Sequence, residues 1–324
     1  MQPEPYFFSV IIPTYARPKQ LAVCLEALAR LNYPRDRFEV IVVDDGSEAP
    51  PEPVVKLFRE RLSLTLLAQP NSGPACARNT GAWQAKGEFL AFIDDDCAPA
   101  AGWLESLAAR LTGTRNTIVG GRTINALPHN LFAATSQLMT DAVYAYYNND
   151  VGRANFFTTN NMAVPAAAFR TLSGFDTSFP FAASEDREFC ERWLRQGYHT
   201  AYAPEAIVNH AHDLTFLGFC RQHFIYGRGA LHFHKVRAGR GWEPINPDSN
   251  FYFHLFSYPF ARSNRRRALL LEVLFALSYA AYTAGFLWEK IQRTVRGQPG
   301  GQAKGKQGGP LGSTRQTTKS RPST

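Results

Sequence analysis

The chain has 324 residues, of which 45% are hydrophobic and 19% charged, and its formal net charge is +8. This composition is ordinary for a globular protein and excludes a collagen-like or wholly disordered chain. The five cysteines form no CxxC pair, so neither a disulfide framework nor a zinc ribbon is predicted. The length fits two domains, or one large α/β domain with additions.

Short apolar segments alternate with segments of helical periodicity in the first third of the chain. The apolar segments predict buried strands at 8–12, 38–43, 64–68 and 88–93. The periodic segments predict helices at 19–31, 54–62 and 74–86. This order indicates a parallel sheet covered by helices.

The part from 98 to 212 is less regular. Helices are predicted at 103–111 and 184–196. Short strands are predicted at 117–121, 156–164, 199–203 and 206–208. The run at 156–164 contains Asn160 and Asn161, and a buried Asn needs hydrogen-bond partners. A bound ligand or a purely structural arrangement would satisfy these amides equally well.

Three predicted strands end in polar residues, at Pro13-Thr14-Tyr15, Asp44-Asp45 and Asp94-Asp95-Asp96. Ligands of an open parallel sheet bind beyond the carboxyl ends of its strands, so these clusters should share one crevice. The Asp44-Asp45 cluster alone is equally typical of a solvated turn. Three adjacent carboxylates repel one another, and Mg²⁺ or Mn²⁺ would compensate that repulsion and neutralise a diphosphate.

Six segments occur in order along residues 8–212: VIIPTY, VVDDGS, NSGPACARNTG, GEFLAFIDDDC, SGFD and SEDREFCERWLRQG. Together they resemble the family 2 glycosyltransferases. The resemblance implies an α/β fold of the GT-A type, with a Rossmann-like mixed sheet and flanking helices. It implies a nucleotide-sugar-binding half at 1–97 and an acceptor and catalytic half at 98–226.

The resemblance also implies roles for single residues. The donor would be bound by Pro13, Tyr15, Asp44, Asp45, Arg78, Asp94, Asp95 and, as one of two alternatives, Asn161. Asp94-Asp95-Asp96 matches the DXD element, and Asp96 is the expected ligand of Mg²⁺ or Mn²⁺, with Asp94 beside it. A His at this distance after the ED pair is a further ligand in some relatives, which favours His210 over His212. Two ordinary loop histidines are the alternative.

The expected catalytic residues are Glu185 and Asp186. An inverting transferase needs one general base, which takes the proton from the acceptor hydroxyl. In the family pattern this base is the Asp of the ED pair, which is Asp186 here. The N-terminus of the predicted helix 184–196 would favour a carboxylate at this place. The alternative is that Ser184 and the acidic residues only cap the helix.

Residues 268–288 contain one charged side chain, Glu272, and are long enough to span a bilayer. Basic residues flank them at 262–267 and 290–296. The segment 227–296 is predicted to be helical, apolar and basic, and residues 268–288 within it are predicted to lie on the cytosolic membrane surface as a peripheral or re-entrant helix. A full span, or a helix buried on the catalytic domain of a soluble cytoplasmic protein, are the alternatives. The composition of 297–324 predicts a disordered tail.

The charge is unevenly divided along the chain. Residues 1–226 hold 19 basic and 23 acidic side chains, whereas residues 227–324 hold 16 and 4. The positive charge therefore accompanies the apolar segment and the tail. Because no nucleic-acid-binding module is present, a membrane surface is the predicted partner and nucleic acid is not.

The sequence thus predicts a metal-dependent inverting glycosyltransferase that moves one sugar to a glycan or lipid-linked acceptor. The residues after Gln222 are HFIY, so the QxxRW element of processive synthases is absent and single-sugar transfer is expected. A non-catalytic nucleotide-sugar-binding scaffold is one alternative. A sugar-phosphate nucleotidyltransferase is another, but the first strand runs into IPTYARPK and lacks the glycine-rich signature of that class.

Overall fold

The computed structural model describes residues 5–111, 116–148, 154–179, 181–245 and 248–297. The predicted disordered tail therefore lies, from residue 298 onward, outside the described residues. The strands are β1 (Phe8–Thr14), β2 (Phe38–Asp44), β3 (Leu64–Ala68), β4 (Phe89–Phe92), β5 (Cys97–Pro99), β6 (Thr117–Asn125), β7 (Met162–Pro165) and β8 (His199–His210). The helices are α1 (Pro18–Leu28), α2 (Glu52–Lys56), α3 (Pro74–Gln84), α4 (Trp103–Leu111), α5 (Leu131–Tyr147), α6 (Ala166–Thr171), α7 (Glu185–Arg195), α8 (Phe216–Gly239), α9 (Ser249–Arg262) and α10 (Arg265–Gly297).

The strands form one mixed sheet in the order β3-β2-β1-β4-β7-β6-β8-β5. The first four of these positions are parallel, with Phe8 beside Phe38 of β2 and Phe89 of β4. The pairs β4–β7, β6–β7 and β5–β8 are antiparallel. The predicted α/β fold with a mixed sheet and flanking helices is confirmed, and both 1–97 and 98–226 contribute strands to it.

The core lies on both faces of the sheet because successive strand residues point to opposite sides. Val10 and Ile12 pack with α1 and α4 on one face. Ile11 packs with α3 and α7 on the other. Strands buried on both faces read as continuous apolar runs, which is why the first strands were predictable.

The structure corrects several predicted elements. Residues 156–164 are not one strand, since Thr159–Asn161 form a 3-10 turn and β7 begins at Met162. The Thr158 hydroxyl donates to the Asn160 side chain, and such side-chain bonds compete with a strand ladder. The two pieces predicted at 199–208 are one strand, β8, and α2 is shorter than its predicted helix. Helix α5 was not predicted from the sequence.

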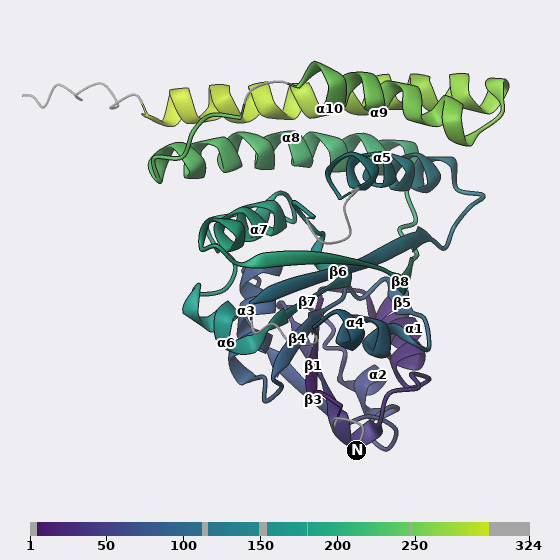
Figure 1. Ribbon diagram of the computed structural model, residues 1–324, viewed down its shortest axis with the longest axis vertical. Helices are drawn as coiled ribbons and strands as arrows, with labels where there is room; N and C mark the ends of the chain where they lie inside the picture. Colours follow the sequence, from purple (N-terminus) through teal and green to yellow (C-terminus); the bar gives the residue numbers. More distant parts are fainter. Residues whose placement is uncertain (1–4, 112–115, 149–153, 180, 246–247, 298–324) are drawn as a thin grey trace, which may run out of the picture.

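The helices α8, α9 and α10 form a layer across one end of the molecule, opposite the end where β1 begins (Figure 1). Helix α10 lies along the outer side of α8. Gly227 of α8 and Gly285 of α10 permit this contact, because a Cβ on either would collide with backbone atoms of the other helix.

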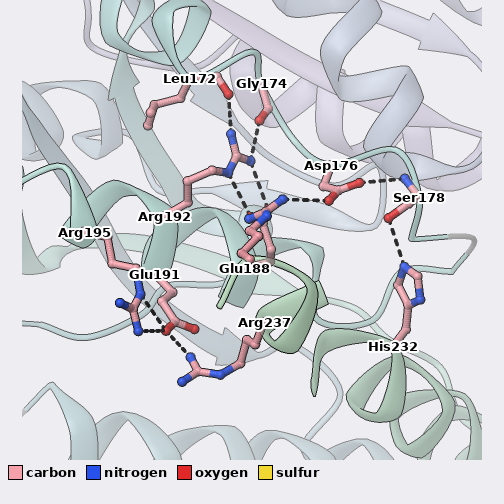
Figure 2. Close-up of polar contacts among 11 residues, drawn as sticks. Leu172, Gly174, Asp176, Ser178, Glu188, Glu191, Arg192, Arg195, His232 and Arg237 are labelled. Carbon is pink, nitrogen blue, oxygen red and sulfur yellow. Dashed lines mark hydrogen bonds and ion pairs between the residues drawn. The ribbon is translucent and has the colours of Figure 1, made fainter. Parts of the chain in front are cut away.

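An ion-pair cluster joins α8 to α7 and to the turn that follows α6 (Figure 2). The fully buried Glu188 accepts from Arg192, at 2.8 Å, and from Arg240, which directly follows α8. Arg240 also pairs with Asp176 at 2.9 Å. Arg237 of α8 forms a second ion pair with α7, through Glu191. These contacts hold the second half of α8 in place over α7.

Helix α10 has two unlike sides. The side toward the protein buries Ala268, Leu271, Leu274, Phe275 and Ser278. The side toward solvent exposes apolar residues that we call the outer stripe: Leu269, Leu270, Val273, Leu277, Leu287, Trp288 and Ile291. Within the described residues, the segment Arg265–Thr294 is the one helix whose length and composition are sufficient to cross a membrane. Only 28% of its most apolar window is buried within the protein.

Candidate active site

A cleft of about 1080 Å³ lies between the ends of β1 and β4, the start of α7, and the layer of C-terminal helices. Residues far apart in the sequence line it together. The predicted site residues in its lining are Pro13, Tyr15, Asp45, Arg78, Asp94, Asp95, Asp96, Glu185, Asp186 and His210. Residues of the three polar clusters after the strands therefore meet in one crevice, as predicted.

Each of the three adjacent aspartates has a different set of partners. Asp94 accepts from Arg78 at 2.7 Å. Asp95 accepts from the Thr14 hydroxyl at 2.7 Å and from Arg17 at 3.2 Å. Asp96 contacts Arg17 at 3.1 Å and the His210 Nε2 at 3.3 Å. The carboxylate repulsion is thus offset by basic side chains on three elements.

These environments move the pKa values of neighbouring carboxyls in opposite directions. Burial raises the pKa of Asp95 to about 6, although Arg17 and Thr14 oppose this shift. Burial also acts to raise the pKa of Asp96, but the hydrogen bond and charge of His210, with Arg17, outweigh it and lower this pKa to about 2. Asp96 is therefore fully ionised at neutral pH, as a metal ligand must be.

Asp96, Cys97 and His210 each offer one ligand atom, and these atoms lie within 4.8 Å of one another. Cys97 is the weakest of the three, because burial and the nearby Asp94 and Asp96 raise the pKa of its thiol well above the usual value. A carboxylate and an imidazole remain, and both are ligands for a divalent cation.

Arg78 joins the two acidic segments. Its guanidinium bonds to Asp94 at 2.7 Å and to Glu185 at 3.0 Å, across 107 residues of sequence in the second case. Arg78 and Glu185 are both buried, and within the described residues the Glu185 Oε2 and the Arg78 Nε have no hydrogen-bond partner. Buried ions normally need full pairing, so these two atoms are exceptions within an otherwise paired cluster.

Asp186 opens α7 and lines the cleft, with one carboxylate oxygen accepting from the Arg187 backbone N–H at 2.7 Å. Burial, followed by the charge of Glu185, raises the pKa of Asp186 to about 7. The preceding Ser184 lies in the left-handed region, with φ 71°, and its side chain makes no capping hydrogen bond. Side-chain capping by Ser184, the alternative to a functional role, therefore does not occur, and the strained residue stands beside the acidic pair.

Two predicted donor residues lie outside the cleft lining. The fully buried Asn161 donates to the carbonyls of Arg122 and Ala206 and accepts from Trp103 at 2.9 Å. Both of its N–H donors and one lone pair of its oxygen are used within the protein, and the residue is fully buried, so these contacts support the structural alternative for this amide. Asp44 is also buried, and its carboxylate accepts from the backbone and hydroxyl of Ser47, which fixes the turn after β2.

Asp45 does line the cleft, but it uses both carboxylate oxygens. It accepts from the backbone N–H groups of Ser72 and Gly73, at 2.9 Å each, and from the Gln69 amide at 2.7 Å. It therefore shapes the loop before α3 at the edge of the cleft. Tyr15, whose ring is half exposed at 50%, is freely accessible.

Arg17 has no predicted role, although it lines the cleft and contacts Asp95 and Asp96. Its position directly after the strand end that carries Pro13 and Tyr15 was the available signal. His212 also joins the site, because Gln222 of α8 links it to the Tyr226 hydroxyl. These contacts bring the first half of α8 to the side of the cleft that carries His210 and His212.

Comparisons with known proteins agree with this arrangement. The family model described as glycosyl transferase family 2 matches residues 9–177. Glycosyltransferase AglE of Haloferax volcanii is 28% identical over 228 residues, which cover 69% of this chain and 73% of AglE. The poly(ribitol-phosphate) beta-N-acetylglucosaminyltransferase TarS of Staphylococcus aureus is 30% identical over 259 residues, or 68% of this chain and 45% of TarS.

A solved structure shows the same fold. The mannosyltransferase PcManGT from Pyrobaculum calidifontis, in complex with GDP-Man and Mn²⁺, superimposes with a TM-score of 0.62 at 19% identity. The superposition covers 92% of this chain and 89% of that protein. Because the family model matches just over half of the chain and the fold agrees, the chain belongs to glycosyl transferase family 2 and is a glycosyltransferase.

Proposed function

We propose that the protein is a metal-dependent, inverting glycosyltransferase that moves one sugar from a nucleotide-sugar to an acceptor hydroxyl. The observation that carries this proposal is the meeting of two acidic segments in one cleft. Asp94-Asp95-Asp96 lies at one place in it and Glu185-Asp186 at another, with Arg78 bonded to both.

Asp186 is the proposed general base. Its raised pKa gives a carboxylate whose proton affinity suits proton transfer near neutral pH. The acceptor oxygen loses its proton to Asp186 as it attacks the anomeric carbon from the face opposite the nucleotide. Glu185 and Asp94 hold the buried Arg78 in position beside the cleft, and the half-exposed Arg17 offers a cationic fork to the donor phosphates.

Asp96 and His210, with Asp94 beside them, are the residues proposed to hold Mg²⁺ or Mn²⁺. The bound ion would supply positive charge that stabilises the departing diphosphate, so no protein acid is needed there. The close approach of the Asp96 and His210 ligand atoms supports this assignment. So does the presence of Mn²⁺ in the PcManGT complex. Pro13, Tyr15, Asp45 and Asp95 are the proposed contacts of the nucleotide and ribose.

The proposed acceptor is a glycan or a lipid-linked sugar at the cytosolic face of a membrane. The outer stripe supports this location, because exposed apolar surface of this length is unusual in a soluble monomer. Basic residues at both ends of α10 would meet anionic headgroups. The stripe and these flanks favour a peripheral arrangement, with α10 lying in the interface.

Metal-dependent donor binding tests the proposal. We expect one member of a panel of nucleotide-sugars to raise the melting temperature with Mn²⁺ and much less without it. At a concentration of 100 times Kd the gain corresponds to about 2.7 kcal/mol. Asp96→Asn should abolish the Mn²⁺-dependent part, whereas Asp36→Asn, an exposed aspartate outside the cleft, should retain it. Equal stabilisation with and without metal would contradict the proposed metal site.

A further inference from the structure

Arg187 follows the proposed base on α7 and lines the same cleft. Its guanidinium lies over the ring of Phe233 of α8, with the central carbon 5.1 Å from the ring centroid. Among the described residues, no carboxylate forms an ion pair with this side chain. A cation over an aromatic face keeps its hydrogen-bonding edge free, so Arg187 presents an unneutralised donor fork to the cleft.

The neighbouring arginines are in a different condition. Arg192 and Arg240 share the buried Glu188, and Arg195 and Arg237 share Glu191 (Figure 2). Those four cations serve the contact between α7 and α8. Arg187 lies on α7 and contacts α8 through the ring of Phe233. Since it forms no ion pair with a described carboxylate, its charge is available to a ligand.

Polar and aromatic groups surround Arg187 in the cleft. His234, Tyr147 and Tyr282 all line it. Burial lowers the pKa of His234, and the charges of Arg187 and Arg237 lower it further. His234 is therefore neutral at pH 7 and can donate one hydrogen bond. Asp248, another acid that lines the cleft, accepts hydrogen bonds from the Tyr146 hydroxyl and from the backbone N–H of Asn250.

This place is separate from the donor's diphosphate. Gln222 of α8 contacts His212 on the metal-binding side of the cleft, and Phe233 lies eleven residues further along the same helix. At 1.5 Å per residue the two places are about 16 Å apart along α8. The donor phosphates would lie at the metal-binding side. A ligand that reaches Arg187 therefore lies beyond the base, on the acceptor side.

We propose that Arg187, with His234, binds a phosphate group of the acceptor. This inference rests on the proposed transferase function and adds the chemical class of its acceptor. A planar guanidinium donates two parallel hydrogen bonds to phosphate oxygens, and a neutral imidazole donates a third. The phosphate would come from a lipid phosphate next to the acceptor sugar or from a phosphorylated polyol chain. Both present the same monoester or diester group to Arg187.

Direct binding of phosphate esters tests the assignment. The full chain is saturated with Mn²⁺ and a nucleoside diphosphate, so that the donor place is filled. Decyl phosphate below its micelle concentration, glycerol 2-phosphate and neutral decyl glucoside are then titrated by calorimetry. We expect at least one phosphate ester to bind, and the neutral glucoside to bind more weakly. Tighter binding of decyl phosphate indicates a lipid phosphate, and tighter binding of glycerol 2-phosphate indicates a polyol phosphate.

Three variants make the test specific. Arg187→Gln should weaken phosphate binding by about tenfold or more, because a charged hydrogen-bond donor is lost. Arg187→Lys should recover part of it, since the charge stays but the fork does not. Arg221→Gln removes an exposed cation of α8 outside the cleft and should bind as the wild type does. All should keep the wild-type melting temperature and nucleotide affinity.

The results separate the two proposals. Normal nucleotide binding with no phosphate-ester binding, or with equal binding by wild type and Arg187→Gln, overturns the acceptor assignment alone. Absence of nucleotide binding in the wild type, measured in the same preparations, would instead count against the transferase function on which it rests.

Discussion

In the two acidic segments of the cleft, four of the five acids are paired with a basic side chain. Arg17 contacts Asp95 and Asp96, His210 contacts Asp96, and Arg78 contacts Asp94 and Glu185. Within these two segments, Asp186 alone has no direct basic side-chain partner among the described residues. That difference explains why burial raises the pKa of Asp186 to about 7 and makes it the best candidate for a base.

The pH dependence of the reaction follows from this pKa. A base acts only when unprotonated, so kcat/KM should rise with pH, by about tenfold per unit, and level off above about 7. Initial rates at low acceptor concentration between pH 5.5 and 8.5 measure it. The residual activity of Asp186→Asn should lack this ionisation. A flat wild-type profile below pH 7 would show that Asp186 is not the titrating base.

Residue types and their order predicted the acidic clusters but not their pairing. The adjacency of Asp94, Asp95 and Asp96 is visible in the sequence, and their shared cleft follows from the parallel strands. The bond between Arg78 and Glu185 is not visible, because it joins helices separated by about a third of the chain. The same holds for Asn161, whose partners are carbonyls of β6 and β8.

At the level of elements, α8 connects the cleft with α10. Its first half meets the side of the cleft that carries His210 and His212 through Gln222, and its second half is held to α7 by the Glu188 cluster. Its other side packs on α10 through Gly227 and Gly285. The position of α10 thus depends on a close approach of two helix backbones.

A larger residue at the glycine contact between α8 and α10 should push the two helices apart. Gly227→Ala places a methyl group against the Tyr282 carbonyl, and such overpacking costs about 1–3 kcal/mol. Gly239→Ala, in the same helix with no atom near its added Cβ, should be neutral or stabilising by up to about 1 kcal/mol. Urea unfolding gives both values, and hydrogen exchange should show faster exchange in α10 for Gly227→Ala only. Equal stability of the two variants would contradict the close α8–α10 contact.

The first buried strands were easier to predict than helix α5. Buried parallel strands leave continuous apolar runs, which mark β1, β2 and β4 clearly. Helix α5 buries only four residues, two of them Ala133 and Thr135, so its sequence carries a weak amphipathic signal. The turn at Thr159–Asn161 is set by side-chain hydrogen bonds, which an apolar pattern does not report.

The molecule as a whole is asymmetric in charge and in apolar exposure. The layer of C-terminal helices lies across one end of the sheet domain (Figure 1). The acidic cleft lies between the two, and the outer stripe and its basic flanks belong to the helical layer. This division was predictable from the charge count along the chain. The packing of one side of α10 on α8 was not, because the apolar run alone does not reveal which residues face the protein.

Vesicle binding tests the role of the outer stripe. Leu269→Gln with Val273→Gln should weaken partition into vesicles with anionic lipid by about 2 kcal/mol, or roughly thirtyfold. Val23→Gln with Leu57→Gln removes equally exposed apolar side chains elsewhere and should leave partition unchanged. Flotation at low and high salt also measures the contribution of the basic flanks. Equal partition of the two double variants would contradict a membrane-facing α10.

The central claim is that Asp186 is the base of an inverting transfer. Once the panel has identified a donor, the most direct measurement compares sugar transfer by wild type and Asp186→Asn in the presence of Mn²⁺, with product configuration read by NMR. We predict an inverted anomeric centre in the wild type. Asp186→Asn should bind the donor normally but transfer about 10² to 10⁴ times more slowly. Retention of configuration, or transfer by Asp186→Asn at the wild-type rate, would contradict the account.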